Sequence, residues 1–256
     1  MNDESAPRNI ALLIDADNAS YHALDPVLTV LAELGTVNIR RVYGNWSKPA
    51  LKNWQAMTIK HGIEPQQQFD VTKGKNATDM KVTIDAMDLL FRGRVEGFGI
   101  MSSDADFMPL AMRIRQDGLP VYGFGNQNTP EGFRQACTRF IDVDILMKTD
   151  QQAVEHPTAN PVDNGQKTDQ SAATPVNTSP KIDNDVIKLL IDAYDASKHD
   201  AQGYVSLSHM GQIAGNRSSF DARNYGFRRL SDLLESISNF TIERRDSGHI
   251  YVRRVR

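Results

Sequence analysis

The stretch that decides the fold is residues 98–107, which read Phe-Gly-Ile-Met-Ser-Ser-Asp-Ala-Asp-Phe. The run from Gly97 to Met101 is short and apolar, as is typical of a strand buried on both faces of a parallel sheet. The chain then turns polar and carries Asp104 and Asp106. Because ligands of open α/β sheets bind beyond the carboxyl ends of the strands, we expect these two carboxylates to line a binding crevice.

A second apolar run near the N-terminus ends in the same way. Residues 9–14 read Asn-Ile-Ala-Leu-Leu-Ile and lead directly into Asp15, with Asn18 three positions further on. Carboxylates gathered in one crevice repel one another unless they are protonated or bridged by a cation. The two strands together therefore predict a divalent metal site, for which short Asp side chains are suitable oxygen donors.

Length and composition limit the classes of protein that the chain can belong to. It has 256 residues, of which 40% are hydrophobic, enough for packed cores in one or two domains. The net charge of -3 gives no overall nucleic-acid signature, so such binding would depend on local basic patches. The single cysteine, Cys137, excludes an intramolecular disulfide and fits a reducing compartment. No apolar run approaches the roughly 20 residues that span a bilayer, so we expect a cytoplasmic protein without membrane contacts.

Between residues 9 and 148, short apolar runs alternate with segments of helical periodicity. After the first strand, the patterns predict strands at 36–43, 63–69, 97–101, 120–124 and 140–145, and helices at 20–34, 49–61, 76–91, 106–116 and 130–136. This alternation predicts an α/β domain with a mostly parallel central sheet and helices on both faces. The helix at 76–91 carries two apolar stripes, one of them Met80, Ile84, Met87 and Phe91, so we expect it to be largely buried.

The composition changes at residue 149. From 149 to 180 there is no aromatic residue and little aliphatic surface, so we expect residues 149–181 to be a disordered linker. From 182 to 256 the chain regains helical stripes and ends in two β-rich segments around Asp246-Ser247-Gly248, a typical hairpin turn. Three helices closed by a hairpin predict a winged-helix domain.

Four acids are the candidate metal ligands, namely Asp15, Asp79, Asp104 and Asp106, with Asn18 as a polar group that orients water or phosphate. Taken singly, each acid has a structural explanation, because Asp also caps helices and favours their first turns. Acids after two central strands and at one helix start are less easily explained as independent caps. Asp17 is left outside the set as a turn cap, and Asp85 is expected to form a solvated ion pair with Lys81.

Other side chains are candidates for contact with a nucleic acid. Hydroxyls can donate to phosphate, lysines and arginines neutralise it, and a tryptophan can stack on a base. The candidates are Ser102, Ser103, Lys73, Lys75 and Trp46 near the crevice, and Arg228, Arg229, Arg244 and Arg245 in the C-terminal domain. The alternatives are that the tryptophan packs on its own loop and that the arginines are ordinary solvated charges.

Three separated motifs, in order, resemble the NYN domain family of PIN-like metal-dependent ribonucleases. They are Ile14-Asp15-x-x-Asn18, Lys73-Gly74-x-x-x-x-Asp79 and Ser102-x-Asp104-x-Asp106-Phe107. The resemblance implies a PIN-like α/β/α sandwich over about residues 9–148, in which the four acids bind Mg²⁺ or Mn²⁺, Asn18 supports them, and water attacks an RNA phosphodiester. One departure is that Asn76-Ala77-Thr78 precedes Asp79, where the family commonly has a short apolar pair.

The run at 225–234, Tyr-Gly-Phe-Arg-Arg-Leu-Ser-Asp-Leu-Leu, is similar to the OST-HTH or LOTUS domain, a winged helix associated with RNA binding. This resemblance covers about residues 182–256 and implies RNA as a partner. Two further partners stay open: a protein bound by the C-terminal domain, and a second copy of the chain in a homodimer.

The sequence as a whole therefore predicts a metal-dependent ribonuclease with a tethered RNA-binding module. One alternative is a non-catalytic RNA-binding adaptor, which the complete set of acids disfavours. A less favoured alternative is a phosphohydrolase of the haloacid dehalogenase type, because Asp15-x-Asp17 follows an apolar strand. Against it, Asn18-Ala19 stands where that family has Thr or Val followed by an apolar residue.

Overall fold

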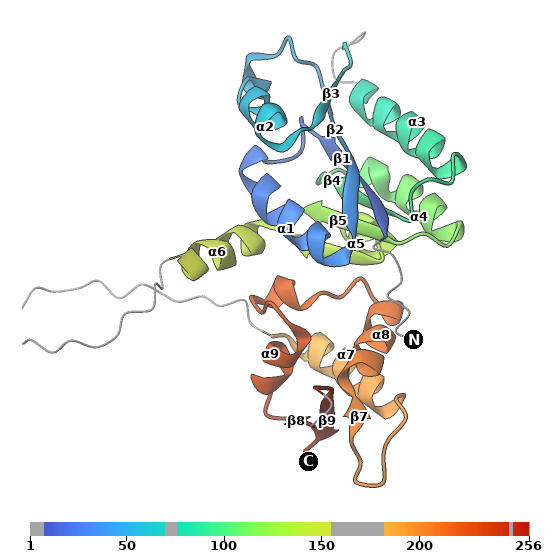
Figure 1. Ribbon diagram of the computed structural model, residues 1–256, viewed down its shortest axis with the longest axis vertical. Helices are drawn as coiled ribbons and strands as arrows, with labels where there is room; N and C mark the ends of the chain where they lie inside the picture. The colour runs from blue at the N-terminus through green and yellow to red at the C-terminus, as the bar shows by residue number, and fades with distance from the viewer. Residues whose placement is uncertain (1–7, 70–75, 155–181, 246–247, 256) are drawn as a thin grey trace, which may run out of the picture.

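The computed structural model describes residues 8–69, 76–154, 182–245 and 248–255. These ranges form an α/β domain followed by a winged-helix domain (Figure 1). Within them, no helix combines the length and the apolar character needed to cross a membrane.

The α/β domain is built on a six-stranded sheet in which every strand pair is parallel, as predicted. The spatial order is β3-β2-β1-β4-β5-β6. The strands are β1 (Asn9–Asp15), β2 (Thr36–Gly44), β3 (Glu64–Gln67), β4 (Gly97–Met101), β5 (Val121–Gly125) and β6 (Arg139–Asp142). The chain builds outward from β1 to β3 and then returns to place β4 on the other side of β1. Such a reversal leaves a crevice at the carboxyl ends of the two central strands.

Helices cover both faces of the sheet (Figure 1). One face carries α1 (Leu24–Leu34), α2 (Trp54–His61) and α6 (Val143–Val154), and the other carries α3 (Ala77–Phe91), α4 (Met108–Gln116) and α5 (Glu131–Ala136). Short 3-10 turns, η1 (Tyr21–Ala23), η2 (Pro49–Leu51) and η3 (Ala105–Phe107), precede α1, α2 and α4. Alternate β1 residues point to opposite faces of the sheet: Leu12 packs with α1, α2 and α6, and Leu13 packs with α3, α4 and α5. The strand is therefore apolar from Ile10 to Ile14.

The prediction that α3 is largely buried is wrong for one of its two stripes. Val82, Ala86 and Leu89 are buried against the sheet. The second stripe faces outward, because a helix in an outer layer of the domain can turn only one face to the sheet.

Asp85 forms the predicted ion pair with Lys81 at 2.9 Å, but the Asp85 carboxylate is buried rather than solvated. The residue is only 8% exposed and also accepts hydrogen bonds from the Tyr43 hydroxyl at 3.1 Å and from Arg41 at 3.4 Å. Asp85 therefore joins α3 to β2 from inside the domain.

The last predicted strand is shorter than expected because a helix begins inside it. Asp142 Oδ1 accepts from the backbone N–H groups of Asp144 and Ile145 at 2.9 and 3.3 Å, which caps α6. The helix continues to Val154, six residues into the predicted linker. The rest of that segment lies outside the described residues.

The C-terminal domain has the predicted winged-helix arrangement. Its helices are α7 (Asn184–Asp195), α8 (Leu207–Arg217) and α9 (Leu230–Glu235), with the 3-10 turn η4 (Ala222–Tyr225) before α9. Its sheet, in the order β7-β9-β8, is antiparallel and consists of β7 (Val205–Ser206), β8 (Phe240–Arg244) and β9 (Ile250–Arg254). Leu190, Met210, Leu233 and Val252 are fully buried between the helices and the sheet.

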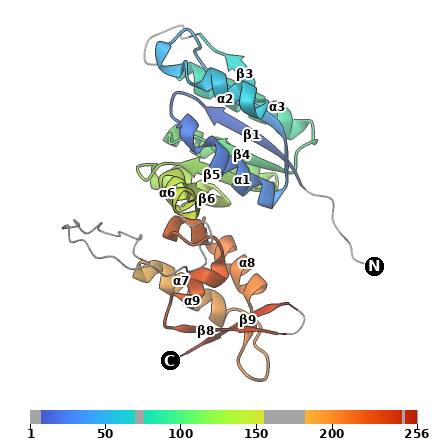
Figure 2. The ribbon, with the colours of Figure 1, turned by 60° about the vertical axis from the view of Figure 1, so that its left-hand side comes forward.

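The winged-helix domain lies against the edge strand β6 (Figure 2). The Phe140 N–H donates to the Ser219 carbonyl at 3.0 Å, so β6 pairs locally with the loop before η4. On the neighbouring helix α1, Glu33 pairs with Arg223. These contacts, together with the covalent connection, hold the two domains together.

Candidate metal centre

Asp15 lies at the carboxyl end of β1, beside the end of β4. Ile14 pairs with Met101 in the sheet, so the next residues on each strand, Asp15 and Ser102, meet at its carboxyl end. The Ser102 hydroxyl donates to Asp15 Oδ2 at 2.9 Å, and both residues are buried. The Asn18 amide donates to the same oxygen at 2.9 Å. Burial raises the pKa of Asp15, and these hydrogen bonds partly offset that rise.

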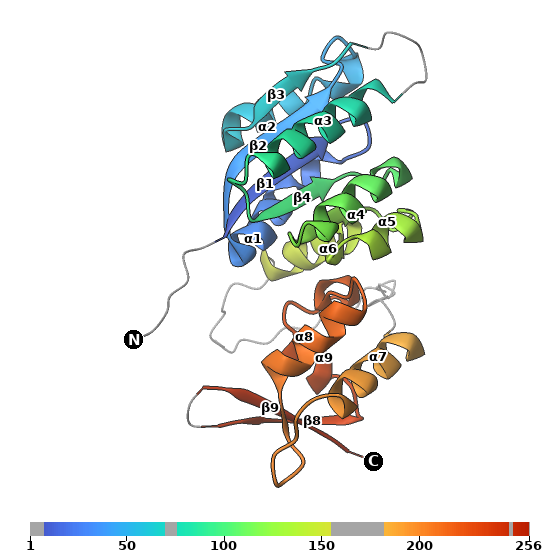
Figure 3. The ribbon, with the colours of Figure 1, turned by 90° about the vertical axis from the view of Figure 1, so that its right-hand side faces the viewer.

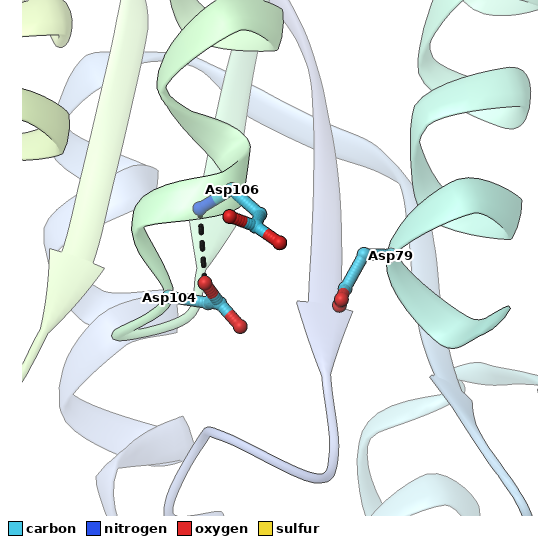
Figure 4. Close-up of side chains that lie close together, drawn as sticks. All are labelled: Asp79, Asp104 and Asp106. Atoms are coloured by element: carbon cyan, nitrogen blue, oxygen red, sulfur yellow. Dashed lines mark hydrogen bonds between the residues drawn. The ribbon is translucent and has the colours of Figure 1, made fainter. Parts of the chain in front are cut away.

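Three further carboxylates gather close to Asp15, whose charge acts on one of them, Asp79. Asp79, Asp104 and Asp106 each place one carboxylate oxygen within 4.8 Å of the other two (Figure 4). Asp79 projects from the first turn of α3, and the other two come from the loop after β4 (Figure 4). Oxygen ligands on opposite sides of one divalent cation lie about 4 to 5 Å apart, so the three oxygens are close enough to share an ion.

The charge of the cluster also suits a cation. Burial, followed by the charges of Asp15, Asp104, Asp106 and Asp17, raises the pKa of Asp79 to about 7. In the described part of the chain, no lysine or arginine forms an ion pair with any of the three clustered acids. Hard oxygen donors with uncompensated negative charge are the donor set expected for a divalent metal.

Asp104 caps η3 and also belongs to the carboxylate cluster. Asp104 Oδ1 accepts from the Asp106 N–H at 2.9 Å and so caps η3 (Figure 4). Capping uses one oxygen and leaves the other for the cluster. The Asn76 side chain, at the N-cap position of α3, does not cap the helix; its amide donates to Asp106 and so ties the start of α3 to the loop after β4.

Asp17 belongs to the same neighbourhood, although the sequence prediction left it out. Its two oxygens accept from Lys48 at 3.1 Å and from the Thr78 hydroxyl at 3.2 Å. It therefore joins the loops after β1 and β2 to the residue before Asp79. The signal available in the sequence was the Asp-x-Asp spacing, which does not distinguish a ligand from a turn residue.

The predicted nucleic-acid contacts near the crevice have structural roles where they are described. Ser102 is committed to Asp15, and Ser103 accepts from the Asn126 N–H at 3.0 Å. Trp46 is half-buried, packs on a core cluster, and its indole N–H donates to the Gln66 carbonyl at 3.1 Å. This is the arrangement expected from loop packing. Lys73 and Lys75 lie outside the described residues.

The four candidate arginines of the winged-helix domain differ in their surroundings. Arg245 lies between Glu243 and Asp200, each at 2.8 Å, and stacks on Tyr251 with its guanidinium carbon 4.1 Å from the ring centroid. Arg228 lies 3.8 Å from Glu33 at the boundary between the domains. Arg229 and Arg244 are exposed, and Arg244 makes a surface pair with Glu235 at 3.2 Å. None of the four joins the carboxylate cluster.

Family models match both parts of the chain. The NYN domain model matches residues 9–146, and the OST-HTH/LOTUS domain model matches residues 177–252. An uncharacterized protein of Methanocaldococcus jannaschii is 30% identical over 137 residues, which are 52% of this chain and 52% of that protein. The chain therefore spans about half the length of this curated relative.

Two solved structures show partial similarity to this chain. A Vibrio parahaemolyticus protein of unknown function is 21% identical over 55% of this chain and 96% of its own, with a TM-score of 0.45. The solution structure of an uncharacterized Nitrosomonas europaea protein is 26% identical over 37% of this chain and 93% of its own, with a TM-score of 0.27.

Proposed function

Because the chain belongs to the NYN domain family, we propose that it is a metal-dependent ribonuclease whose winged-helix domain binds the RNA substrate. The observation that carries the proposal is the gathering of Asp79, Asp104 and Asp106, with one oxygen of each within 4.8 Å of the others, close to the buried Asp15. The OST-HTH/LOTUS match supports RNA as the class of polymer that is cleaved.

In this proposal the three clustered acids hold Mg²⁺ or Mn²⁺. When bound, such an ion neutralises charge on a phosphodiester and makes a coordinated water more acidic. The protein supplies the ion's ligands from two elements, α3 and the loop after β4, which Asn76 connects. Asp15 supports them from below through Ser102, which also accepts from the Asp104 N–H at 3.1 Å.

The burial of Asp15 disfavours the phospho-aspartate alternative. A nucleophilic carboxylate must reach the phosphorus of its substrate with one oxygen exposed. Asp15 is 1% exposed, and both of its oxygens accept hydrogen bonds, from the Asp17 N–H on one side and from Asn18 and Ser102 on the other. The adaptor remains as the competing proposal.

The proposal is tested by cleavage of labelled single-stranded RNA with purified protein in Mg²⁺ or Mn²⁺ and in EDTA. Asp79→Asn and Asp104→Asn keep the side-chain shape and remove one charge each, so we expect each to lower the cleavage rate at least about 100-fold. Asp117→Asn is the matched control, because Asp117 follows the end of α4 and, among the described residues, pairs only with Arg113 on the surface. Equal cleavage by wild type and both variants would reject the metal centre, and RNA binding without cleavage by the wild type would favour the adaptor.

The role of the winged-helix domain has a separate test. Arg229→Ala and Arg244→Ala should each weaken RNA binding and lower the slope of affinity against salt by about one unit, as expected for the loss of one phosphate contact. Arg94→Ala, an exposed arginine of the other domain, should leave both quantities unchanged. Unchanged affinity in both winged-helix variants would show that RNA binds elsewhere.

A further inference from the structure

The outer face of α3 exposes an apolar stripe made of Met80, Ile84, Met87 and Phe91. Met80, Ile84 and Phe91 are 61%, 53% and 72% exposed, and Met87 is half-buried. Large apolar side chains gathered on one exposed helix face are characteristic of a protein contact. The stripe lies on the side of the domain that carries α3 and α4, away from the winged-helix domain at β6 (Figure 3).

The spacing of this α3 stripe is that of a helix-packing seam. Its four residues are successively four, three and four positions apart, the alternation that brings side chains onto one line for packing against another helix. We propose that the α3 stripe is the contact between two copies of this chain, with the two α3 helices antiparallel about a two-fold axis. The pairing sets Met80 against Phe91 of the second copy and Ile84 against Met87, so each apolar side chain meets a counterpart.

Charges beside the stripe favour the antiparallel arrangement. Lys81 and Asp88 lie on the same flank of the seam, one near each end of the helix. In an antiparallel pair, equivalent flanks face one another with the helix direction reversed, so Lys81 of each copy faces Asp88 of the other. In a parallel pair, equivalent flanks lie on opposite sides of the seam, so Lys81 would not meet Asp88 of the other copy. The Lys81 ammonium donates to Asp85 and has further donors available for a second carboxylate.

The neighbouring helix enlarges the contact. The Arg113 guanidinium lies over the Phe91 ring, 5.8 Å from its centroid, so α4 lies beside the end of α3. On α4, Met112 is 43% exposed. Two copies joined in this way form a layer of four helices, α3 and α4 from each copy.

The association state can be measured without reference to RNA cleavage, on which this proposal does not depend. Sedimentation equilibrium of the full chain over a range of concentrations should show a monomer–dimer equilibrium. Ile84→Glu places a charge at the centre of the seam and should raise the dissociation constant at least tenfold. Ile59→Glu is the control, because Ile59 is 78% exposed on α2, which covers the opposite face of the sheet.

Cysteine cross-linking tests the direction of the two helices. Oxidation of a mixture of Met80→Cys and Phe91→Cys chains should give mainly the mixed disulfide, because those positions meet only in an antiparallel pair. The native Cys137 is 1% exposed and should not react. The proposal is overturned by a wild type that stays monomeric at all concentrations, by Ile84→Glu dimerising as wild type does, or by Met80→Cys chains cross-linking mainly with each other.

Discussion

The backbone N–H of Asp142, in the edge strand β6, donates to the side-chain oxygen of Asn224 at 2.8 Å, although the two residues are 82 positions apart. The Asn224 amide nitrogen donates in turn to the Phe140 carbonyl at 2.7 Å. The Asn224 side chain thus makes hydrogen bonds to β6 that a neighbouring strand would otherwise make. An edge strand with unpaired backbone groups is a site for unwanted pairing with other chains, and here the winged-helix domain covers it.

Asn224→Ala should loosen the attachment of the winged-helix domain. The variant leaves one donor and one acceptor of β6 without their partner. At a partly buried site this lowers the stability of the domain contact by about 1–3 kcal/mol. We expect a larger radius of gyration in small-angle X-ray scattering and faster proteolysis between the domains. Asn239→Ala, in the same domain, should match wild type, and a compact Asn224→Ala protein would mean that the Glu33 contacts suffice.

Asp79→Asn should stabilise the metal-free protein, and more so at high pH. The folded-state pKa of Asp79 is about 7, against an ordinary value of 3.8, so the folded state holds this proton more tightly. Ionisation of Asp79 therefore lowers the free energy of unfolding as the pH rises from about 4 through 7, and the variant lacks this loss. In EDTA, its gain in melting temperature should be larger at pH 8 than at pH 5. Saturating Mg²⁺ should reverse the sign, because the variant loses a ligand.

Asp85→Ala should destabilise the α/β domain by about 1–3 kcal/mol, because the Tyr43 hydroxyl loses its buried acceptor. Burial alone, which Asp85→Ala leaves in place, raises the pKa of Tyr43, so ionisation of the hydroxyl cannot relieve the loss. Urea unfolding gives the free energy. Glu64→Gln, which removes the exposed partner of Arg41, is the comparison and should change stability by no more than about 0.5 kcal/mol.

Gly125→Ala should disturb the metal centre through Ser102. A Cβ at this position would lie 2.3 Å from the Thr129 hydroxyl and 2.8 Å from the carbonyl of Ser102, whose side chain holds Asp15. We expect the free energy of unfolding to fall by about 1–3 kcal/mol and RNA cleavage to slow, since the backbone carbonyl cannot move freely. Gly215→Ala in α8 meets no atom within 4 Å and should stabilise the protein by about 0.5–1 kcal/mol. Unaltered melting in Gly125→Ala would show that the site has room to adjust.

The sequence was informative where a local pattern has one structural outcome. The run at 97–101 is the strand β4, and all five of its residues are buried, as expected for a short apolar run at the centre of a parallel sheet. Parallel strands end at one edge of the sheet, so the acids after β1 and β4 had to approach each other. The position of Asp79 depended on the start of α3, which Asn76 fixes through a contact with Asp106 that no spacing rule predicts.

The sequence did not predict the contacts that a side chain makes with a distant part of the chain. Periodicity marks both stripes of α3 as apolar, but only the packing of α3 on the sheet decides which one is covered. The same limit applies to Asn224, whose partner strand lies in another domain. The Lys81–Asp85 spacing gave the ion pair but not its burial, because the Tyr43 and Arg41 contacts come from β2.

The covering of β6 by the winged-helix domain also has a consequence for folding during translation. The strand leaves the ribosome before the segment around Asn224, which follows 82 residues later. At translation rates of about 5–20 residues per second, this delay is roughly 4 to 16 s. During that interval the nascent α/β domain can form its sheet while β6 is still open, so pauses in translation between the two domains should increase the demand for chaperones.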